Sequence, residues 1–222
     1  MTLNEGRLRE LQVRNQKIVG CRLCPRLVEW REDIGKLKRK SYADWDYWAR
    51  PVPDFGDPDA KRLIVGLAPA AHGANRTGLM FHGDRSGDWL YRALHKAGLA
   101  KLPKADARED GQELYGVLIT ATCHCAPPDN KPTPTEIQTC KPFLDEILHD
   151  RPWRCILCLG ALAWENVLRS IGAPRTKFGH SVELEHAGTL LVASFHPSQQ
   201  NTFTGKLTEE MLDSVVSRFA NR

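Results

Sequence analysis

The chain has 222 residues, and its 31 lysines and arginines against 27 aspartates and glutamates give a formal net charge of +4. Apolar residues make up 41% and charged residues 26%, values near the globular average, which exclude disorder, collagen and coiled coil as descriptions of the whole chain. No apolar run approaches the roughly 18 residues of a membrane span. The N-terminus also lacks an apolar signal-peptide core, so we expect a cytoplasmic protein with no membrane partner.

The first 60 residues predict two helices followed by a long loop. Apolar spacing over residues 3–19 predicts a helix that Gly20 ends, and Pro25 suits the first turn of a second helix running toward Lys40. Residues 1–40 hold eleven basic and five acidic residues, a local balance of +6. We interpret residues 1–60 as a basic helical appendage of a single domain that spans residues 1–222.

Aromatic residues follow the basic end of this appendage, namely Tyr42, Trp45, Tyr47 and Trp48. Basic residues beside aromatic ones suit a polyanion whose bases can stack, such as a nucleic acid. The alternative is a solvated helix end followed by a loop that packs its aromatic rings on the core. Composition alone favours this second interpretation.

Beyond residue 60, short apolar runs alternate with helical patterns. Strands are predicted at residues 63–67, 117–121, 155–160 and 190–194. Helices are predicted at 89–97, at 136–149 with Thr135 as the cap, near 161–171, and at the end of the chain with Thr208 as the cap. This alternation predicts an α/β fold with a parallel sheet between helices, and ligands bound beyond the carboxyl ends of its strands.

The seven cysteines are more typical of metal ligation than of disulfides in a chain without an export signal. Cys21 and Cys24 are two residues apart in the gap between two predicted helices, so both thiolates reach one metal or cluster. Cys125 follows a strand, and Cys140 lies in the next helix. These four form the preferred set, with Cys123 as the rival to Cys125, and spacing leaves zinc and an iron–sulfur cluster both open.

A second pair, Cys155 and Cys158, has the same two-residue gap but lies within a predicted strand. An offset of three on a strand places the two thiols on opposite faces of the sheet. We therefore predict that this pair belongs to the core.

Two titratable residues near strand ends are the catalytic candidates. Asp84 lies just before a predicted helix, where its simplest role is to cap the first free backbone amides. His196 follows a strand and precedes Pro197, so it either stabilises a turn or donates to a ligand. Phe81 suits the core or a stacking platform. The loop after the first strand adds polar groups of less specific meaning: His72, Asn75 and Arg76.

Three long segments carry a resemblance to a known family. Residues 66–78 read GLAPAAHGANRTG, residues 196–202 read HPSQQNT, and residues 125–140 read CAPPDNKPTPTEIQTC. The first two resemble the two motifs of family 5 (type B) uracil-DNA glycosylases, and the third resembles that family and the related family 4. Two long motifs with four cysteines in order are highly specific, and the similarity extends from Cys21 to the last helix.

The resemblance implies a three-layer α/β/α sandwich with a four-stranded, mostly parallel central sheet. It implies a monofunctional DNA glycosylase that removes uracil from DNA and initiates base excision repair, acting as a monomer without a nucleotide cofactor. It also implies a structural [4Fe–4S] cluster on Cys21, Cys24, Cys125 and Cys140, whereas Cys123 has no ligand counterpart in the family.

The resemblance also assigns roles at the site. A glycosylase extrudes its base from the duplex, and Phe81 is expected to stack on it. Asp84 is expected to stabilise the cationic sugar and orient water, and His196 to stabilise the departing base. The remaining expected substrate contacts are Gly66, Leu67, Ala68, His72, Asn75 and Ala121.

Two positions depart from the related family 4. That family has an acidic residue where Leu67 stands, so water activation must come from elsewhere here. It has an asparagine near the end of the second strand, where this chain has Ala121. Losing this base-edge contact predicts relaxed selectivity, with release of hypoxanthine and xanthine as well as uracil.

Two hypotheses from other classes remain at this stage. One is a non-catalytic nucleic-acid-binding module with a redox-sensing iron–sulfur cluster. The other is a zinc-dependent hydrolase. Asp84 beside Phe81 in the motif loop argues for an enzyme, because a binding module does not need a carboxylate there.

Overall fold

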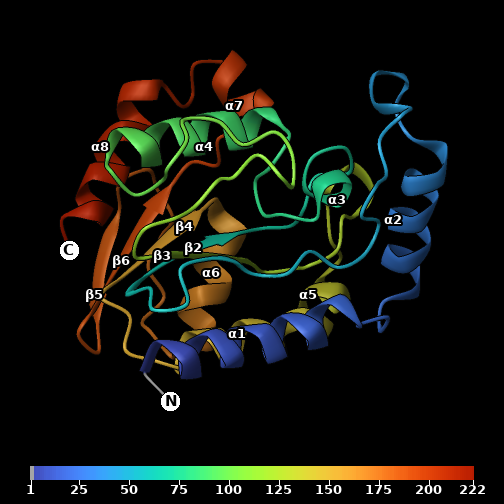
Figure 1. The fold of residues 1–222 in the computed structure, drawn as a ribbon. Helices are drawn as coiled ribbons and strands as arrows, with labels where there is room; N and C mark the ends of the chain where they lie inside the picture. The colour runs from blue at the N-terminus through green and yellow to red at the C-terminus, as the bar shows by residue number, and fades with distance from the viewer. Residues whose placement is uncertain (1–2) are drawn as a thin grey trace.

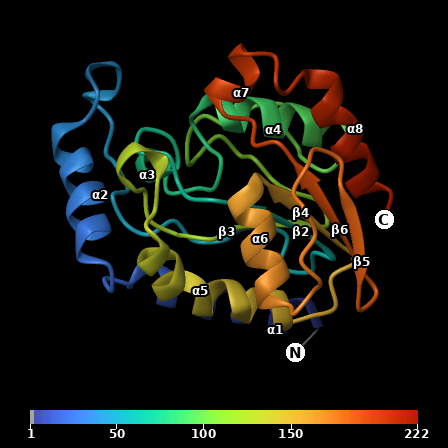
Figure 2. The same ribbon diagram turned by 180° about the vertical axis from the view of Figure 1, so that it is seen from behind.

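The computed structural model describes residues 3–222, which form a six-stranded sheet with helices on both faces (Figures 1 and 2). The strands are β1 Phe55–Gly56, β2 Arg62–Gly66, β3 Val117–Ala121, β4 Cys155–Leu159, β5 Glu183–His186 and β6 Thr189–Ser194. The helices are α1 Leu3–Val19, α2 Pro25–Leu37, α3 Ala74–Thr77, α4 Arg85–Lys96, α5 Pro134–His149, α6 Ala161–Ser170, α7 Gln199–Phe203 and α8 Glu209–Ala220. Short 3-10 helices span Lys40–Tyr42 and Pro128–Asn130.

The strand order is β1-β3-β2-β4-β6-β5, and the four central strands β3, β2, β4 and β6 are mutually parallel. The parallel α/β sheet predicted from the alternation is therefore confirmed. The predicted number of strands is wrong, because antiparallel β1 and β5 extend the sheet at its two edges. Strand β1 has only two residues, too few for a periodic pattern. Strand β5 alternates exposed and half-buried residues and forms a hairpin with β6 across Ala187 and Gly188, a turn signal that sequence analysis missed.

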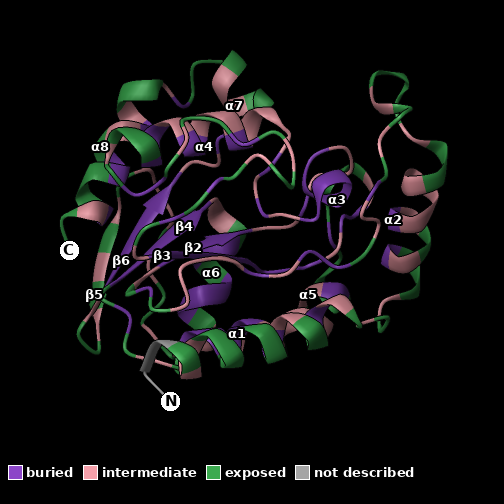
Figure 3. Cartoon of the chain, in the orientation of Figure 1, coloured by how far each residue is buried: buried purple, intermediate pink, exposed green. Residues whose placement is uncertain are grey.

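Two apolar clusters lie on the two faces of the sheet, and the four central strands between them are the most continuously buried part of the chain (Figure 3). Helices α4 and α8 contribute to one cluster, and α5 and α6 to the other. Helix α1 runs beside α5 and buries Leu11 in the second cluster, so it belongs to that helical layer (Figure 1). Cys155 lies in the first cluster and Cys158 in the second, which confirms that their thiols face opposite sides of the sheet.

Most predicted helices occur where expected, with differences at their ends. Helix α2 ends at Leu37, short of Lys40, because Lys38 adopts a left-handed conformation with φ +52° and its N–H donates to the Ile34 carbonyl. Helix α5 is capped by Thr133, so the prediction of Thr135 is wrong. Thr133 accepts from the Glu136 N–H while the Glu136 carboxylate accepts from the Thr133 N–H, a capping box that offsets two free amides at once.

The predicted cap Thr208 is confirmed at α8, where its hydroxyl accepts from the Met211 N–H. Helix α4 begins at Arg85, four residues earlier than predicted, because Asp84 caps it. None of the helices among residues 3–222 is long and apolar enough to cross a membrane.

Candidate functional site

Neighbouring strands β2 and β4 send their chains to opposite faces of the sheet. The chain leaves β2 toward α4 in the first cluster, and it leaves β4 toward α6 in the second. Such a divergence opens a crevice at the carboxyl edge of a parallel sheet, where ligands bind in α/β folds. At this edge Gly66 ends β2, Gly160 follows β4, and His196 follows β6.

Phe81 lies at this edge in a strained backbone conformation. Its φ is +59°, in the left-handed region that a bulky residue rarely adopts. Its ring lies on Gly66, where an added Cβ would stand 3.0 Å from Phe81 Cζ, so a side chain at residue 66 would push the ring away. Strain of this kind is retained where the surrounding structure holds a residue for function.

The ring of His196 stacks on that of Phe81, with 5.9 Å between ring centroids and 28° between planes. A base sandwiched between both rings needs roughly 7 Å, twice an aromatic contact distance of about 3.5 Å. A base therefore does not fit between the two rings as they stand.

His196 is half-buried, and it combines a structural contact with a titratable ring. Its carbonyl accepts a 2.8 Å hydrogen bond from Asn201 Nδ2, which holds the turn after β6. Burial lowers the pKa of the His196 imidazole to about 4. The ring is therefore neutral at pH 7, and one of its nitrogens carries a proton that it can donate.

Asp84 is the N-cap of α4, as its simplest interpretation predicted. Its Oδ1 accepts a 2.9 Å hydrogen bond from the Gly87 N–H. The carboxyl group packs against Gly73, where any Cβ would collide with Oδ2, so glycine is required there for the loop to approach. Burial raises the pKa of Asp84, while hydrogen bonds from the Gly87 and Ser86 amides act in the opposite direction. The cap leaves open whether the carboxylate also takes part in chemistry.

The other expected substrate contacts separate into two groups. Gly66, Leu67 and Ala68 continue from β2 into the motif loop, and Ala121 ends the neighbouring strand β3, paired with Gly66. Asn75 is fully buried, and its Nδ2 donates to the carbonyls of Arg31 (3.2 Å) and Ala71 (3.4 Å). The structure thus uses Asn75 to join the motif loop to α2, and a substrate contact at this residue stays a prediction.

The aromatic residues after α2 pack on the motif loop. Tyr47 is buried, and its hydroxyl lies 3.0 Å from Nδ1 of His72. Trp48 donates through Nε1 to the Pro51 carbonyl at 2.9 Å. Packing of the aromatic rings on the protein is therefore confirmed for Tyr47 and for Trp48, which lies against the first cluster, whereas Tyr42 and Trp45 are half-buried and belong to neither cluster. These aromatic rings lie against the motif loop and hold it in place, and no local pattern in the sequence predicts this contact. The nucleic-acid interpretation stays a prediction.

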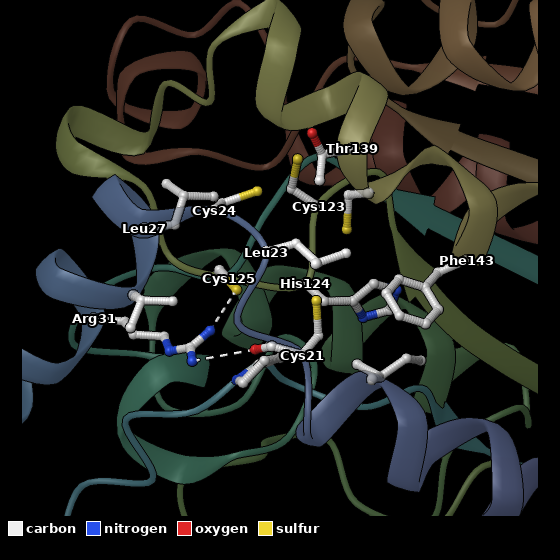
Figure 4. Close-up of a pocket in the computed structure, with 14 residues that line it drawn as sticks. Cys21, Leu23, Cys24, Leu27, Arg31, Cys123, His124, Cys125, Thr139 and Phe143 are labelled. Carbon is white, nitrogen blue, oxygen red and sulfur yellow. Dashed lines mark hydrogen bonds between the residues drawn. The ribbon is translucent and has the colours of Figure 1, made fainter.

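Five cysteines line one cavity between the α1–α2 connection, the segment after β3 and helix α5 (Figure 4). The sulfur-bearing residues of this cavity are Cys21, Cys24, Cys123, Cys125 and Cys140. The structure thus brings together the four preferred cysteines and also their rival. Within residues 3–222, no three His, Cys, Asp or Glu side chains are grouped closely enough to bind a single metal ion.

A buried arginine faces these cysteines. Arg31 is 1% exposed, and its Nη1 lies 2.8 Å from the sulfur of Cys125 while its Nη2 donates to the Cys21 carbonyl at 3.3 Å (Figure 4). Burial raises the pKa of the Cys125 thiol to about 12, and Arg31 acts against this by favouring the thiolate. The nearest carboxylate, Glu32, is 4.0 Å away. A buried guanidinium is stabilised by a negative charge beside it, and a neutral thiol supplies none.

Comparison with known proteins agrees with this architecture. Residues 53–220 match the model of the uracil DNA glycosylase superfamily. A type-5 uracil-DNA glycosylase of Mycobacterium bovis is 51% identical over 208 residues, which cover 90% of this chain and 77% of that protein. Proteins of the same description from Thermus thermophilus and Pyrobaculum aerophilum are 47% and 46% identical, covering 90% and 92% of this chain and 93% and 89% of theirs.

Proposed function

The chain belongs to the uracil-DNA glycosylase superfamily, and from this premise we propose that it hydrolyses the N-glycosidic bond between uracil and deoxyribose in DNA. The observation that carries the proposal is the strained Phe81, whose ring bridges Gly66 and His196 three residues before Asp84. An aromatic platform, a carboxylate and a neutral donor at one sheet edge are the groups that this reaction needs. Release of uracil from a duplex containing one uracil tests the proposal.

The reaction follows from these groups. The target nucleotide leaves the stack, and its base lies on Phe81. The bond from C1′ to the base nitrogen breaks with both electrons going to the base, so the sugar becomes cationic and the base anionic. The Asp84 carboxylate stabilises the cation and orients a water molecule, whose oxygen bonds to C1′. One proton of this water is lost to solvent, and the departing base anion takes up a proton from solvent, so the products are the sugar hydroxyl and the neutral base. The His196 N–H donates to the base oxygen where the negative charge develops.

The protonation state of His196 gives a direct prediction. Because burial lowers the pKa of His196 to about 4, its ring stays neutral when the pH falls from 8 to 5.5. Histidine NMR of ¹⁵N-labelled protein over this range should show no titration of His196. Assignment comes from the His196→Gln variant. A midpoint for His196 near the ordinary value of about 6.5 contradicts a neutral donor.

The substrate range is the second prediction. Ala121 presents no polar group at the end of β3, so we propose that hypoxanthine and xanthine are released as well as uracil. Duplexes that differ only in one modified base measure this, and release of uracil alone contradicts it. Ala121→Asn adds a base-edge contact worth about 1–3 kcal/mol and should shift the rates toward uracil by roughly 5- to 150-fold. Ala121→Leu, similar in size but apolar, separates crowding from hydrogen bonding.

We also propose that the cysteine cavity holds a [4Fe–4S] cluster on Cys21, Cys24, Cys125 and Cys140. The thiolates of such a cluster each bind a different iron, so their sulfurs stand further apart than the ligands of a single ion. The four cysteines come from the α1–α2 connection, the segment after β3 and helix α5, and all of them line the one cavity. Arg31 also fits, because four thiolates give the cluster a net negative charge beside the buried guanidinium. When bound, the cluster ties α2 to α5 and supplies no step of the glycosidic reaction.

A further inference from the structure

Arg76, in helix α3 of the motif loop, is buried without a carboxylate partner. It is 2% exposed, and no carboxylate oxygen in the described part of the chain lies within 4.0 Å of its guanidinium. Two aromatic rings lie against it instead: its Cζ is 4.1 Å from the ring centroid of Tyr42 and 3.9 Å from that of Trp45. Such contacts are attractive for a desolvated cation, and they fix the plane of the guanidinium.

The hydrogen bonds of Arg76 join it to the loop that carries Asp84. Its Nε donates to the His72 carbonyl at 2.8 Å, and its Nη2 donates to the Gly83 carbonyl at 3.0 Å. Gly83 immediately precedes Asp84 and has φ +77°. A Cβ at Gly83 would collide with Arg76 Nη2, so glycine permits this close approach. Arg76 therefore bridges the two ends of the loop that presents Asp84, since Gly73, against which the carboxyl packs, directly follows His72.

We propose that Arg76 is the positioning residue for Asp84, and that Tyr42 and Trp45 hold Arg76 in place for this purpose. The inference rests on the proposed glycosylase activity and deepens it. Arg76 acts through the Gly83 carbonyl and the loop backbone, whereas Asp84 faces the reacting sugar. The aromatic segment after α2 thereby becomes a part of the active site that touches no substrate.

Charge adds a second effect, which a purely structural role would not produce. The groups that act electrostatically on the Asp84 carboxylate are Asp88 from α4, which favours its protonation, and Arg76 from α3, which opposes it. The negative charge of Asp84 in turn helps to raise the pKa of Tyr91 in α4, after the larger effect of burial. Removing the charge of Arg76 therefore moves the protonation of Asp84 to higher pH, while a lysine at residue 76 keeps the charge and loses the planar fork.

The test measures single-turnover uracil release, DNA affinity and pH dependence for three arginine variants. Arg76→Gln should lower the saturated rate by roughly 10²-fold, which is the usual effect of a small misplacement of a catalytic group. The affinity for DNA should be unchanged. The acid limb of the rate, the pH below which the rate falls, should move to a higher value. Arg76→Lys should lower the rate with the limb unmoved. The matched control is Arg108→Gln, because Arg108 also lies over an aromatic ring of this segment, 4.6 Å from Trp48, and donates to the Thr77 carbonyl. The saturated rate of Arg108→Gln should stay within threefold of that of the unmodified protein.

Two results overturn the inference while leaving the proposed function standing: an Arg76→Gln variant that cleaves within threefold of the unmodified protein, or one whose acid limb is unmoved. If Arg76→Gln does not fold, the comparison of Trp45→Leu with Trp45→Phe decides, because only the first removes the ring over Arg76. Equal rates for these two variants contradict the inference. Failure of the unmodified protein to release uracil contradicts the proposed function instead.

Discussion

Asp84→Asn is expected to lower the single-turnover rate of uracil release by about 10²–10⁴-fold, the usual contribution of a positioned acid or base, while DNA affinity stays unchanged. Asparagine is nearly the same size and caps helices as well as aspartate does, so its side-chain oxygen still accepts from the Gly87 N–H. The substitution thus removes the negative charge and keeps the cap. Quenched-flow or gel-based cleavage of a uracil duplex, with fluorescence anisotropy for affinity, measures both.

The cap has its own control in helix α8, which packs against α4. Thr208→Ala removes an equivalent N-cap hydrogen bond from α8, the 3.2 Å bond to the Met211 N–H, and should cost about 1 kcal/mol of stability with cleavage intact. If Asp84→Asn cleaves as fast as the unmodified protein, Asp84 is a cap and nothing more. Retained binding with lost cleavage instead distinguishes an enzyme from a nucleic-acid-binding module.

The pH dependence of the unmodified protein follows from the same carboxylate. Burial raises the pKa of Asp84, so the ionised form is lost at a higher pH than for an ordinary aspartate as the solution is acidified. The rate should therefore fall on the acid side, and the neutral His196 contributes no opposing change above about pH 5. In Asp84→Asn this acid limb should be absent from the residual activity.

Cys125→Ala is expected to remove the visible absorbance of the proposed cluster and to lower the melting temperature by roughly 10–20 °C. A cluster joining Cys24 to Cys125 closes a loop of 125 − 24 = 101 residues. Loop closure of this size restricts the unfolded chain by about 5 kcal/mol, and each kcal/mol corresponds to about 2–4 °C for a chain of this length. Absorbance spectroscopy, iron and sulfide analysis, and thermal melts of anaerobically purified protein measure the effect.

The chain offers two controls for this variant. Cys123→Ala tests the rival ligand, since Cys123 lines the same cavity and is buried. Cys158→Ala removes a thiol from the core on a strand and tests the cost of losing sulfur alone. Both should keep the visible absorbance and four irons per chain. Loss of the absorbance in Cys123→Ala but not in Cys125→Ala contradicts the proposed ligand set.

Much of the fold was predictable because it depends on neighbours in the chain. The four parallel strands are continuous apolar runs, and Thr208 starts its helix through a bond three residues away. The cap role of Asp84 was predicted for the same reason, whereas its proposed catalytic role came from the family resemblance. The edge strand β1 was not predictable, because two residues carry no period and pair only because β3 presents a free edge.

The cysteines show where prediction from sequence ends. Their order and gaps selected Cys21, Cys24, Cys125 and Cys140, and the structure gathers these four around one cavity. Nothing in the spacing indicated Arg31, which reaches Cys125 across 94 residues of sequence. Its place depends on how α2 packs against the segment after β3, a contact that the local pattern of either segment does not encode.

By itself, the sequence determined the order of the four parallel strands and of the longer helices, the motif loops and the candidate residues on them. Only the tertiary structure decided that Tyr42 and Trp45 enclose Arg76, that Arg76 holds the backbone beside Asp84, and that Phe81 lies against His196. The reason is physical. Turns, caps and apolar periods arise from interactions within a few residues, whereas buried charges and stacked rings find their partners only when distant segments are packed together.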